Sequence, residues 1–358
     1  MSTFNPEIEF EKEVYLPGEE VTGRAWISTN KDFKVKTVEI TFAGKTVTAW
    51  KSAKKAVETK TNLKGEETYV EMKHEVWAPD DEEHTFPAGD YEWKFSFELP
   101  KDCPPSFEGR FGFIRYSVLL HMDIPNAPAK NVERAVTVSP IIDLNGIPEA
   151  REPAKVHLDN MVYCCACLPC LPSRGNVVYT LTSPKLGYVS GETVTVAGQI
   201  DNQTNKPLRL IEAKLIRKIT YREELQGKSK GKKSRNTQNA DGFKSKIDNQ
   251  ILETKLERCN VPSRTNTEYA FTFTIPPVVA TIRGSRFITV EYFVSIFGDT
   301  GMCNRGESAS LNILVGNIPV STGHVSLPSQ AFVDGNAAQA WKVDLKPNFI
   351  SQVPYYGN

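Results

Sequence analysis

Four cysteines lie within seven residues of this 358-residue chain, at Cys164, Cys165, Cys167 and Cys170. Thiolates at this spacing are typical zinc ligands, but a tetrahedral zinc site generally combines two separated pairs, and no second pair follows here. The same thiols lie beside two Leu-Pro pairs, where reversible acylation would tether the chain to a membrane. A third interpretation is that they are small structural residues. All three interpretations stay open on the sequence alone.

A second cluster is basic and consists of Lys228, Lys230, Lys232, Lys233 and Arg235. It is not a phosphate-binding loop of the Gly-x-x-x-x-Gly-Lys type, because only three residues separate its glycines and no strand-helix unit surrounds it. As a loop between two strands it would contact anionic lipid headgroups, at roughly 1 kcal/mol for each basic residue near the surface. A phosphorylated receptor tail is another suitable anion. The alternative is a solvated loop without a partner.

The sequence does not indicate an enzyme. Its five histidines are dispersed, no Gly-x-Ser-x-Gly nucleophile motif occurs, and residues 80–84 have the composition of an acidic surface loop. We therefore expect no catalytic residues and no cofactor. Lys and Arg together number 43, as do Asp and Glu, so no overall charge would attract nucleic acid.

The composition also bears on the compartment. The first residues lack a basic segment followed by an apolar one, and no apolar run approaches the ~20 residues that a membrane-spanning helix needs. Four of the seven cysteines are packed into one short segment, and the seven do not form a spread-out disulfide framework, which favours a reducing compartment. The sequence therefore predicts a cytoplasmic protein.

The elements that must position these segments occur twice. Three motifs recur in the same order: Tyr15-x-x-Gly18-Glu19-x-Val21 as Tyr188-x-x-Gly191-Glu192-x-Val194, Phe95-x-Phe97-x-Leu99-Pro100 as Phe271-x-Phe273-x-Ile275-Pro276, and Tyr116-x-Val118 as Tyr292-x-Val294. The first repeats at an offset of 173 residues and the other two at 176. Three matches in one order indicate two similar domains in tandem.

Period-2 alternation predicts that both domains consist of strands. Residues 91–99, 114–120 and 290–296 place large apolar side chains on one face, and residues 35–42 correspond to 208–215 as a further shared strand. Helical periodicity is scarce, with at most one short helix from Trp50 to Thr59. Turn residues at short intervals predict an all-β protein of two tandem immunoglobulin-like β-sandwiches. We expect the repeated residues to be core and turn positions rather than a binding site.

Changes in pattern predict four regions. We expect a first sandwich at 5–145, a connector with the cysteine cluster at 146–175, a second sandwich at 176–319 and a flexible tail at 320–358, where alternation stops.

Several segments resemble the α-arrestins, the arrestin-domain-containing proteins. The matching segments are Tyr15 to Glu19, Phe86 to Gly89, Pro105 to Gly109, Cys164-Cys165-x-Cys167, Gly187 to Glu192 and Leu314 to Pro319. The resemblance covers about residues 5–320. It implies two arrestin-type sandwiches and a non-enzymatic adaptor that binds cytoplasmic tails or loops of membrane proteins during endocytosis or endosomal sorting. Such an adaptor is recruited to the plasma membrane or endosomes. The alternative is a structural subunit of a stable sorting coat, like the small arrestin-like subunit of retromer.

Many α-arrestins carry Pro-Pro-x-Tyr motifs after the second domain, which dock on WW domains of ubiquitin ligases through the prolines and the tyrosine. This chain departs from that pattern, because it has no complete motif. Its nearest approach is Val353-Pro354-Tyr355-Tyr356, which keeps the second proline and the correctly spaced tyrosine. Our hypothesis is that Val353, Pro354 and Tyr356 form a degenerate WW ligand.

Overall fold

The computed structural model describes residues 4–51, 62–79, 84–163, 173–224, 243–299 and 307–321. Within these ranges the chain forms largely antiparallel β-sheets with two short 3₁₀ helices, η1 (Leu144–Gly146) and η2 (Pro148–Arg151), between the two halves. Two tandem β-sandwiches are therefore confirmed. Within the same ranges, no helix has the length and apolar character needed to cross a membrane.

In the first sandwich a three-stranded sheet, β1-β3-β8, packs on a larger sheet, β2-β11-β10-β5-β6, and β9 pairs with β10. A small sheet, β4-β7, lies beside them. The strands are β1 (Phe4–Phe10), β2 (Val14–Tyr15), β3 (Glu20–Thr29), β4 (Phe33–Lys34), β5 (Thr37–Lys51), β6 (Asn62–Trp77), β7 (Thr85–Phe86), β8 (Gly89–Glu98), β9 (Phe107–Gly109), β10 (Gly112–Asp123) and β11 (Lys130–Val138).

The second sandwich repeats this plan. A four-stranded sheet, β12-β13-β15-β18, packs on a five-stranded one, β14-β20-β19-β16-β17, whose order matches the larger sheet of the first half strand by strand. The strands are β12 (Ala154–Tyr163), β13 (Ser173–Ser183), β14 (Gly187–Val189), β15 (Thr193–Asn202), β16 (Leu208–Glu224), β17 (Phe243–Val261), β18 (Thr265–Thr274), β19 (Ile288–Asp299) and β20 (Ala309–Gly316). In both halves one short strand joins in parallel, β2 beside β11 and β14 beside β20.

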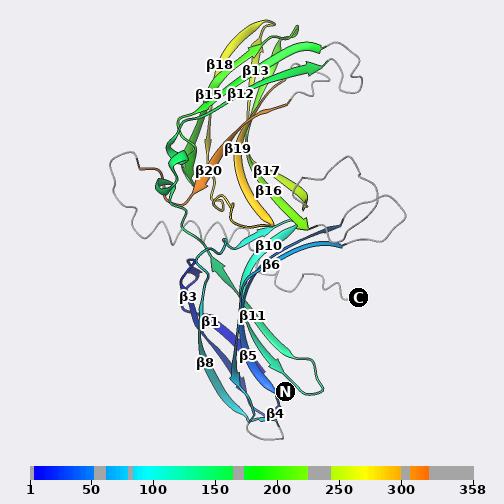
Figure 1. Ribbon diagram of the computed structural model, residues 1–358, viewed down its shortest axis with the longest axis vertical. Coiled ribbons are helices and arrows are strands. Elements are labelled where there is room, and N and C mark those ends of the chain that lie inside the picture. The colour runs from blue at the N-terminus through cyan, green and yellow to red at the C-terminus, as the bar shows by residue number, and fades with distance from the viewer. Residues whose placement is uncertain are drawn as a thin grey trace, which may run out of the picture.

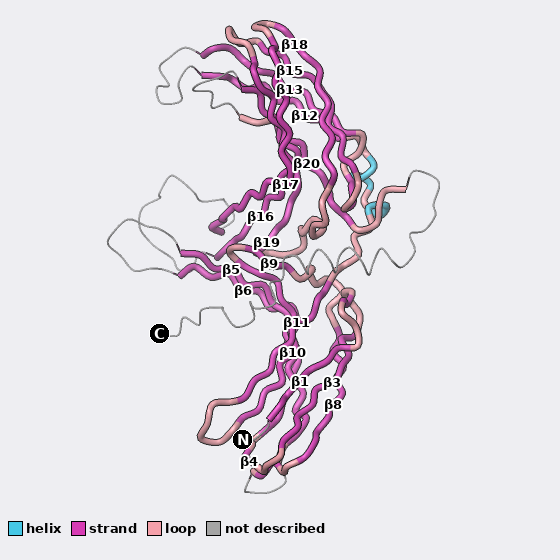
Figure 2. The backbone as a smooth tube through the Cα atoms, turned by 180° about the vertical axis from the view of Figure 1, so that it is seen from behind, coloured by secondary structure: helices cyan, strands magenta, loops and turns pink. Residues whose placement is uncertain are grey.

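The two sandwiches lie end to end and form a bent, crescent-like molecule (Figures 1 and 2). At its middle, β5 and β6 of the first sandwich meet β16 of the second. Both views place β3 and β8 on the outer side of the bend. This arrangement puts the ends of the longest strands of the two larger sheets against each other.

The repeated Tyr-x-x-Gly-Glu motif forms the same turn in both halves. The Glu19 amide donates to the Leu16 carbonyl at 3.1 Å and the Glu192 amide to the Val189 carbonyl at 3.0 Å. The glycine at the third position has φ of +83° for Gly18 and +86° for Gly191, as a type II turn requires. Each glutamate then accepts a hydrogen bond from the first turn amide, at 2.9 Å and 3.1 Å respectively. In the first copy this bond lowers the pKa of Glu19, with a smaller contribution from Lys12.

The strand positions predicted from alternation form the core. Ile114, Tyr116, Val118 and their counterparts in β19 are at most 1% exposed. The aligned tyrosines also bond alike, because the Tyr116 hydroxyl donates to the Pro104 carbonyl at 2.7 Å and the Tyr292 hydroxyl donates to the Val279 carbonyl at 2.6 Å. The repeated residues are thus scaffold in both copies, as expected.

Two expectations were wrong in part. Trp50 and Lys51 do not begin a helix but end β5, and the remainder of that segment lies outside the described residues. The expected connector at 146–175 contains strand β12, which pairs with β13 from Ala154 to Tyr163. The second sandwich therefore begins before residue 176, because β12 is an edge strand of its four-stranded sheet.

The turn geometry yields a stability prediction. Replacing Gly191 with alanine should lower the free energy of unfolding by about 1–2 kcal/mol, because a Cβ at positive φ strains the backbone. No other atom lies within 4 Å of the added Cβ, so the cost is that of the backbone alone. Chemical denaturation followed by circular dichroism measures it. Gly146→Ala is the control, because its Cβ also meets nothing within 4 Å and its φ is not positive; equal losses in both variants would contradict the prediction.

Candidate functional site

The three sites predicted from the sequence lie outside the described residues. The cysteine cluster at 164–170 falls between Tyr163 and Ser173, which are paired at the ends of β12 and β13. These two strand ends lie at the end of the second sandwich that is remote from the first (Figure 1). The basic cluster at 228–235 joins Glu224 of β16 to Phe243 of β17. Residues 353–356 follow the last described residue, Ser321. The three clusters therefore stay predictions.

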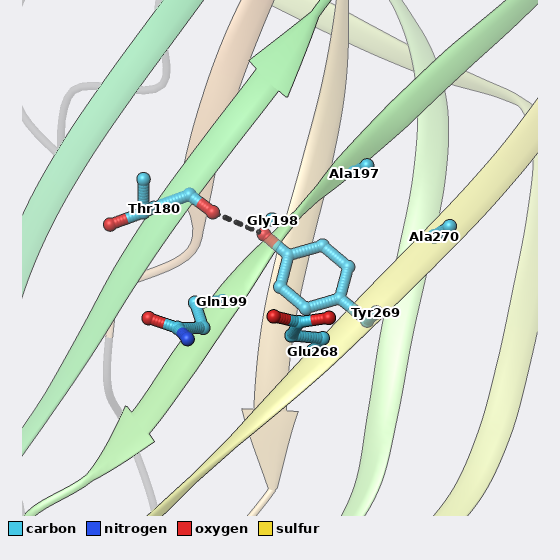
Figure 3. A pocket seen from close by; sticks show the side chains of 7 residues that line it. All are labelled: Thr180, Ala197, Gly198, Gln199, Glu268, Tyr269 and Ala270. Atoms are coloured by element: carbon cyan, nitrogen blue, oxygen red, sulfur yellow. Dashed lines mark hydrogen bonds between the residues drawn. The ribbon is translucent and has the colours of Figure 1, made fainter.

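A shallow, open hollow of about 580 Å³ lies on the second sandwich (Figure 3). It forms where Gly198 of β15 has no side chain, and the Tyr269 ring lies across this position to donate its hydroxyl hydrogen to the Thr180 carbonyl at 3.0 Å. Gln199 and Glu268 stand beside the ring. In the described part of the chain, no three His, Cys, Asp or Glu side chains are grouped to hold a metal ion. The hollow is explained by the packing of one tyrosine over one glycine.

The junction between the sandwiches carries more polar structure. On β5 the inward-facing positions change from apolar, at Phe42, to hydroxyl, at Thr46 and Thr48, and all three side chains are fully buried. The Thr48 hydroxyl donates to the Arg222 carbonyl of β16 at 2.6 Å. This hydrogen bond crosses from the first sandwich to the second, so the end of β5 is fixed to the end of β16.

A second polar contact crosses the junction at Tyr69 of β6. Its hydroxyl lies 2.7 Å from Thr46 Oγ1, 2.9 Å from Glu67 Oε2 and 3.1 Å from Ser285 Oγ of the second sandwich. Burial raises the pKa of Tyr69 to about 12, so the hydroxyl keeps its proton and can donate it at neutral pH. Tyr69 therefore links both sandwiches in one network.

Aromatic and cationic groups complete the junction. The Phe111 ring, in the turn between β9 and β10, meets the Tyr221 ring edge to face with centroids 5.5 Å apart. Lys246 Nζ lies 3.7 Å from the centre of the Phe111 ring, which is a favourable cation–π distance. The two sandwiches approach each other closely at Gly65 of β6, because this residue has no side chain. A Cβ at Gly65 would lie 2.6 Å from Phe287 Cδ1 and 2.9 Å from the Arg222 carbonyl.

The most unusual group at the junction is Glu223, the penultimate residue of β16. Its side chain is fully buried, and both carboxylate oxygens lack a hydrogen-bond partner of good geometry. Burial raises the pKa of Glu223 to about 7, although the backbone of Trp50 and the charges of Lys244 and Lys246 act to lower it. An unpaired buried carboxylate is costly, so proton uptake stabilises the junction.

Sequence reasoning missed Glu223, although a signal was present. It occupies an inward-facing position of β16, in phase with the buried residues Ile219 and Tyr221. An acid in phase with core residues at the end of a long strand marks a place where another domain covers the strand. The described junction thus supplies hydrogen bonds, ring contacts and one titratable acid, which position two sandwiches relative to each other.

Comparison with known proteins identifies the family to which this architecture belongs. The family model of the arrestin (or S-antigen) N-terminal domain matches residues 4–145, and that of the arrestin C-terminal domain matches residues 173–320. Two arrestin domains joined at a packed junction define an arrestin-type protein. The chain belongs to the α-arrestins, the arrestin-domain-containing branch of the arrestin family.

Several curated proteins are similar to this chain. Arrestin domain-containing protein 17 of Caenorhabditis elegans is 25% identical over 355 residues, covering 92% of this chain and 76% of the relative. Arrestin domain-containing protein 1 of Mus musculus is 28% identical over 58% of this chain and 45% of its own length. Thioredoxin-interacting protein of Homo sapiens is 24% identical over 59% of this chain and 52% of its own length. The chain thus spans about half the length of the latter two.

The burial of Glu223 predicts a pH-dependent stability. A carboxyl group has a pKa of about 4.3 in an unfolded chain, so between that value and about 7 the folded state holds the extra proton. Stability then falls as pH rises through this window. Glu223→Gln removes the penalty, and should raise the free energy of unfolding at pH 8 by about 1–3 kcal/mol over the original chain. The gain should shrink toward pH 5.

Denaturation of both proteins across this pH range is the measurement. Glu224→Gln is the matched control, because Glu224 is exposed and pairs with Arg286 at the surface, where an ion pair contributes little. A gain from Glu223→Gln that does not depend on pH would contradict the assignment of a buried acid.

The close approach at Gly65 predicts a separable junction. Gly65→Ala should weaken the contact between sandwiches, because the added Cβ meets the Phe287 ring, the Arg222 backbone and the Thr48 hydroxyl that bonds to Arg222. We expect faster proteolysis between residues 139 and 153 and a larger radius of gyration in solution scattering. Gly146→Ala again serves as the control, because its Cβ meets no atom. An unchanged radius with uniform loss of stability would instead locate the damage within the first sandwich.

Proposed function

We propose that this protein is an adaptor for membrane-protein trafficking, acting in endocytosis or endosomal sorting by binding cytoplasmic tails or loops of its cargo. Arrestin-family proteins are generally non-enzymatic adaptors, and the homologous arrestin-domain proteins fit that role. The single observation that carries the proposal is the presence of both arrestin domains in one packed unit. Such a unit presents several strand edges to an extended peptide, which binds by adding a strand.

The described residues that flank the basic cluster support membrane recruitment. Residues 225–242 leave β16 at Glu224 and return at Phe243, and both ends lie at the junction beside Arg222, Lys246 and Arg286. A basic surface at this place would approach anionic lipid headgroups. We place the protein in the cytoplasm, with recruitment to the plasma membrane or endosomes. Acylation within the cysteine cluster at 164–170 would add a second membrane contact at the remote end of the second sandwich.

The tail is the proposed site of ubiquitin-ligase recruitment. Val353, Pro354 and Tyr356 keep part of a WW ligand, in which proline packs on aromatic side chains and tyrosine fills its own pocket. The folded unit ends later than residue 319, because Val320 packs against the cluster of Leu144 and Ala150. The Ser321 amide donates to Asn145 Oδ1 at 2.8 Å. Residues 322–358 are therefore the segment to remove when the tail is tested.

Proximity labelling in cells tests the adaptor function. The full chain should label membrane proteins and a WW-domain ligase, and deletion of 322–358 should remove the ligase while keeping the membrane proteins. Tyr356→Ala should reproduce the loss of ligase, whereas Tyr355→Ala, at the variable motif position, should not. Stoichiometric co-purification with a fixed set of subunits would overturn the transient adaptor in favour of a coat subunit.

Vesicle binding tests the basic cluster separately. Charge reversal of Lys228, Lys230, Lys232, Lys233 and Arg235 should abolish sedimentation with phosphatidylserine vesicles, and the original chain should bind neutral vesicles weakly or not at all. Raising the salt concentration should weaken the binding, because exposed charges are screened. Unchanged binding after charge reversal would contradict the lipid contact.

A further inference from the structure

Strand β17 forms one edge of the five-stranded sheet of the second sandwich. It has 19 residues and pairs on one side with β16, while no described strand pairs with its other side. On its outward face, three large apolar side chains are more than half exposed: Ile247 at 54%, Ile251 at 55% and Leu256 at 62%. A long open edge with exposed apolar residues is a template for pairing with another strand.

A bulge divides β17 into two halves. Leu215 of β16 faces Glu253 and Ile216 faces Ile251, so Leu252 is the extra residue. Because a bulge shifts the alternation by one position, the outward-facing residues are odd-numbered before it, at Ile247, Asn249 and Ile251, and even-numbered after it, at Thr254 and Leu256. Ile247 and Leu256 therefore lie on the same face of the sheet, and Asp248 and Lys255 lie together on the opposite face.

The two halves complement each other in an antiparallel pair of identical strands. When the two-fold axis passes between Ile251 and Leu252, apolar residues face apolar ones and opposite charges face each other. The opposed positions are Ile247 with Leu256, Asp248 with Lys255, Lys246 with Glu257, Asn249 with Thr254 and Gln250 with Glu253. The shift at Leu252 keeps both members of each pair on one face of the joined sheet.

Neighbouring registers lack this complementarity. Moving the axis by one residue toward the start of β17 sets Asp248 opposite Glu253 and Lys246 opposite Lys255, and moving it the other way sets Asp248 opposite Glu257. Like charges that face each other across strands are destabilising. Moving the axis by half a residue in either direction would set inward-facing residues opposite outward-facing ones. The charges of β17 thus select one register.

We propose that β17 is a self-association edge, at which a second copy of this chain pairs antiparallel about the Ile251 and Leu252 positions. The contact is isologous, so each complementary pair occurs twice. It joins two five-stranded sheets into one continuous sheet. Ile247 and Leu256 of the two copies then cover each other's exposed apolar surface.

A charge exchange tests the proposal. Sedimentation of the purified full chain over micromolar concentrations should show a monomer–dimer equilibrium. Asp248→Lys alone, or Lys255→Asp alone, makes both central charge pairs repulsive and should weaken the dimer about tenfold or more. The double variant Asp248→Lys with Lys255→Asp restores opposite charges and should recover the dimer.

The controls make each outcome decisive. Glu268→Lys reverses an exposed charge on β18, the edge strand of the other sheet, and should leave the dimer unchanged. Circular dichroism confirms that each variant is folded. A chain that stays monomeric at all concentrations overturns the proposal, and so does a dimer that ignores both single variants.

A disulfide tests the register directly. Asn249 and Thr254 are exposed and face each other across the proposed axis, where opposed Cβ atoms lie about 4.5–5.5 Å apart. The variant Asn249→Cys with Thr254→Cys should form an intermolecular bond between these two positions on mild oxidation, mapped by peptide mass. The pair Asn249→Cys with Leu256→Cys is out of register and should not. Equal cross-linking of both pairs overturns the assigned register.

Discussion

The relative position of the two sandwiches depends on the contact between the ends of β5 and β6 and the end of β16. Gly65 allows the backbones to approach, and the Thr48 hydroxyl fixes the Arg222 carbonyl across the gap. The buried hydrophobic residues of the two sandwiches form one continuous cluster, and residues 225–242 leave and re-enter the second sandwich beside this contact. The directional hydrogen bonds and ring contacts of the junction define one relative position of the two domains.

The junction buries the carboxyl group of Glu223, which costs free energy when the group is ionised. The buried carboxylate has no hydrogen-bond partner of good geometry. Burial therefore favours its protonated form, although a glutamate in water is ionised at neutral pH. Stability at the junction is therefore coupled to proton concentration. Lys244 and Lys246 moderate this cost through their positive charge, and Lys246 at the same time packs on Phe111.

Sequence and structure agree where local rules decide the outcome. The turns followed from the glycines of the repeated motif, Gly18 and Gly191, since few residues other than glycine tolerate positive φ, and the core followed from alternation around Tyr116 and Tyr292. Strand β12 was missed because Pro153 and the neighbouring cysteines give its flanks the composition of a connector. The burial of Thr48 was missed because the opposite domain sets it, whereas Glu223 carried a local signal as an acid in phase with Ile219 and Tyr221. The predicted cysteine, basic and tail sites stay predictions, because they lie outside the described residues.

The two strand ends that meet at the junction are related by the internal repeat of the sequence. Trp50 and Glu223 stand 173 residues apart, as do Thr48 and Tyr221, which is the offset of the repeated turn motif. The strand ends that meet are thus equivalent positions of the two copies, and the chain is built as a dimer whose subunits are covalently joined. In a dimer of identical chains both ends would have to change together. Because the two ends belong to one polypeptide they can differ, and the two sides of the junction are chemically different, with Trp50 on one and Glu223 on the other.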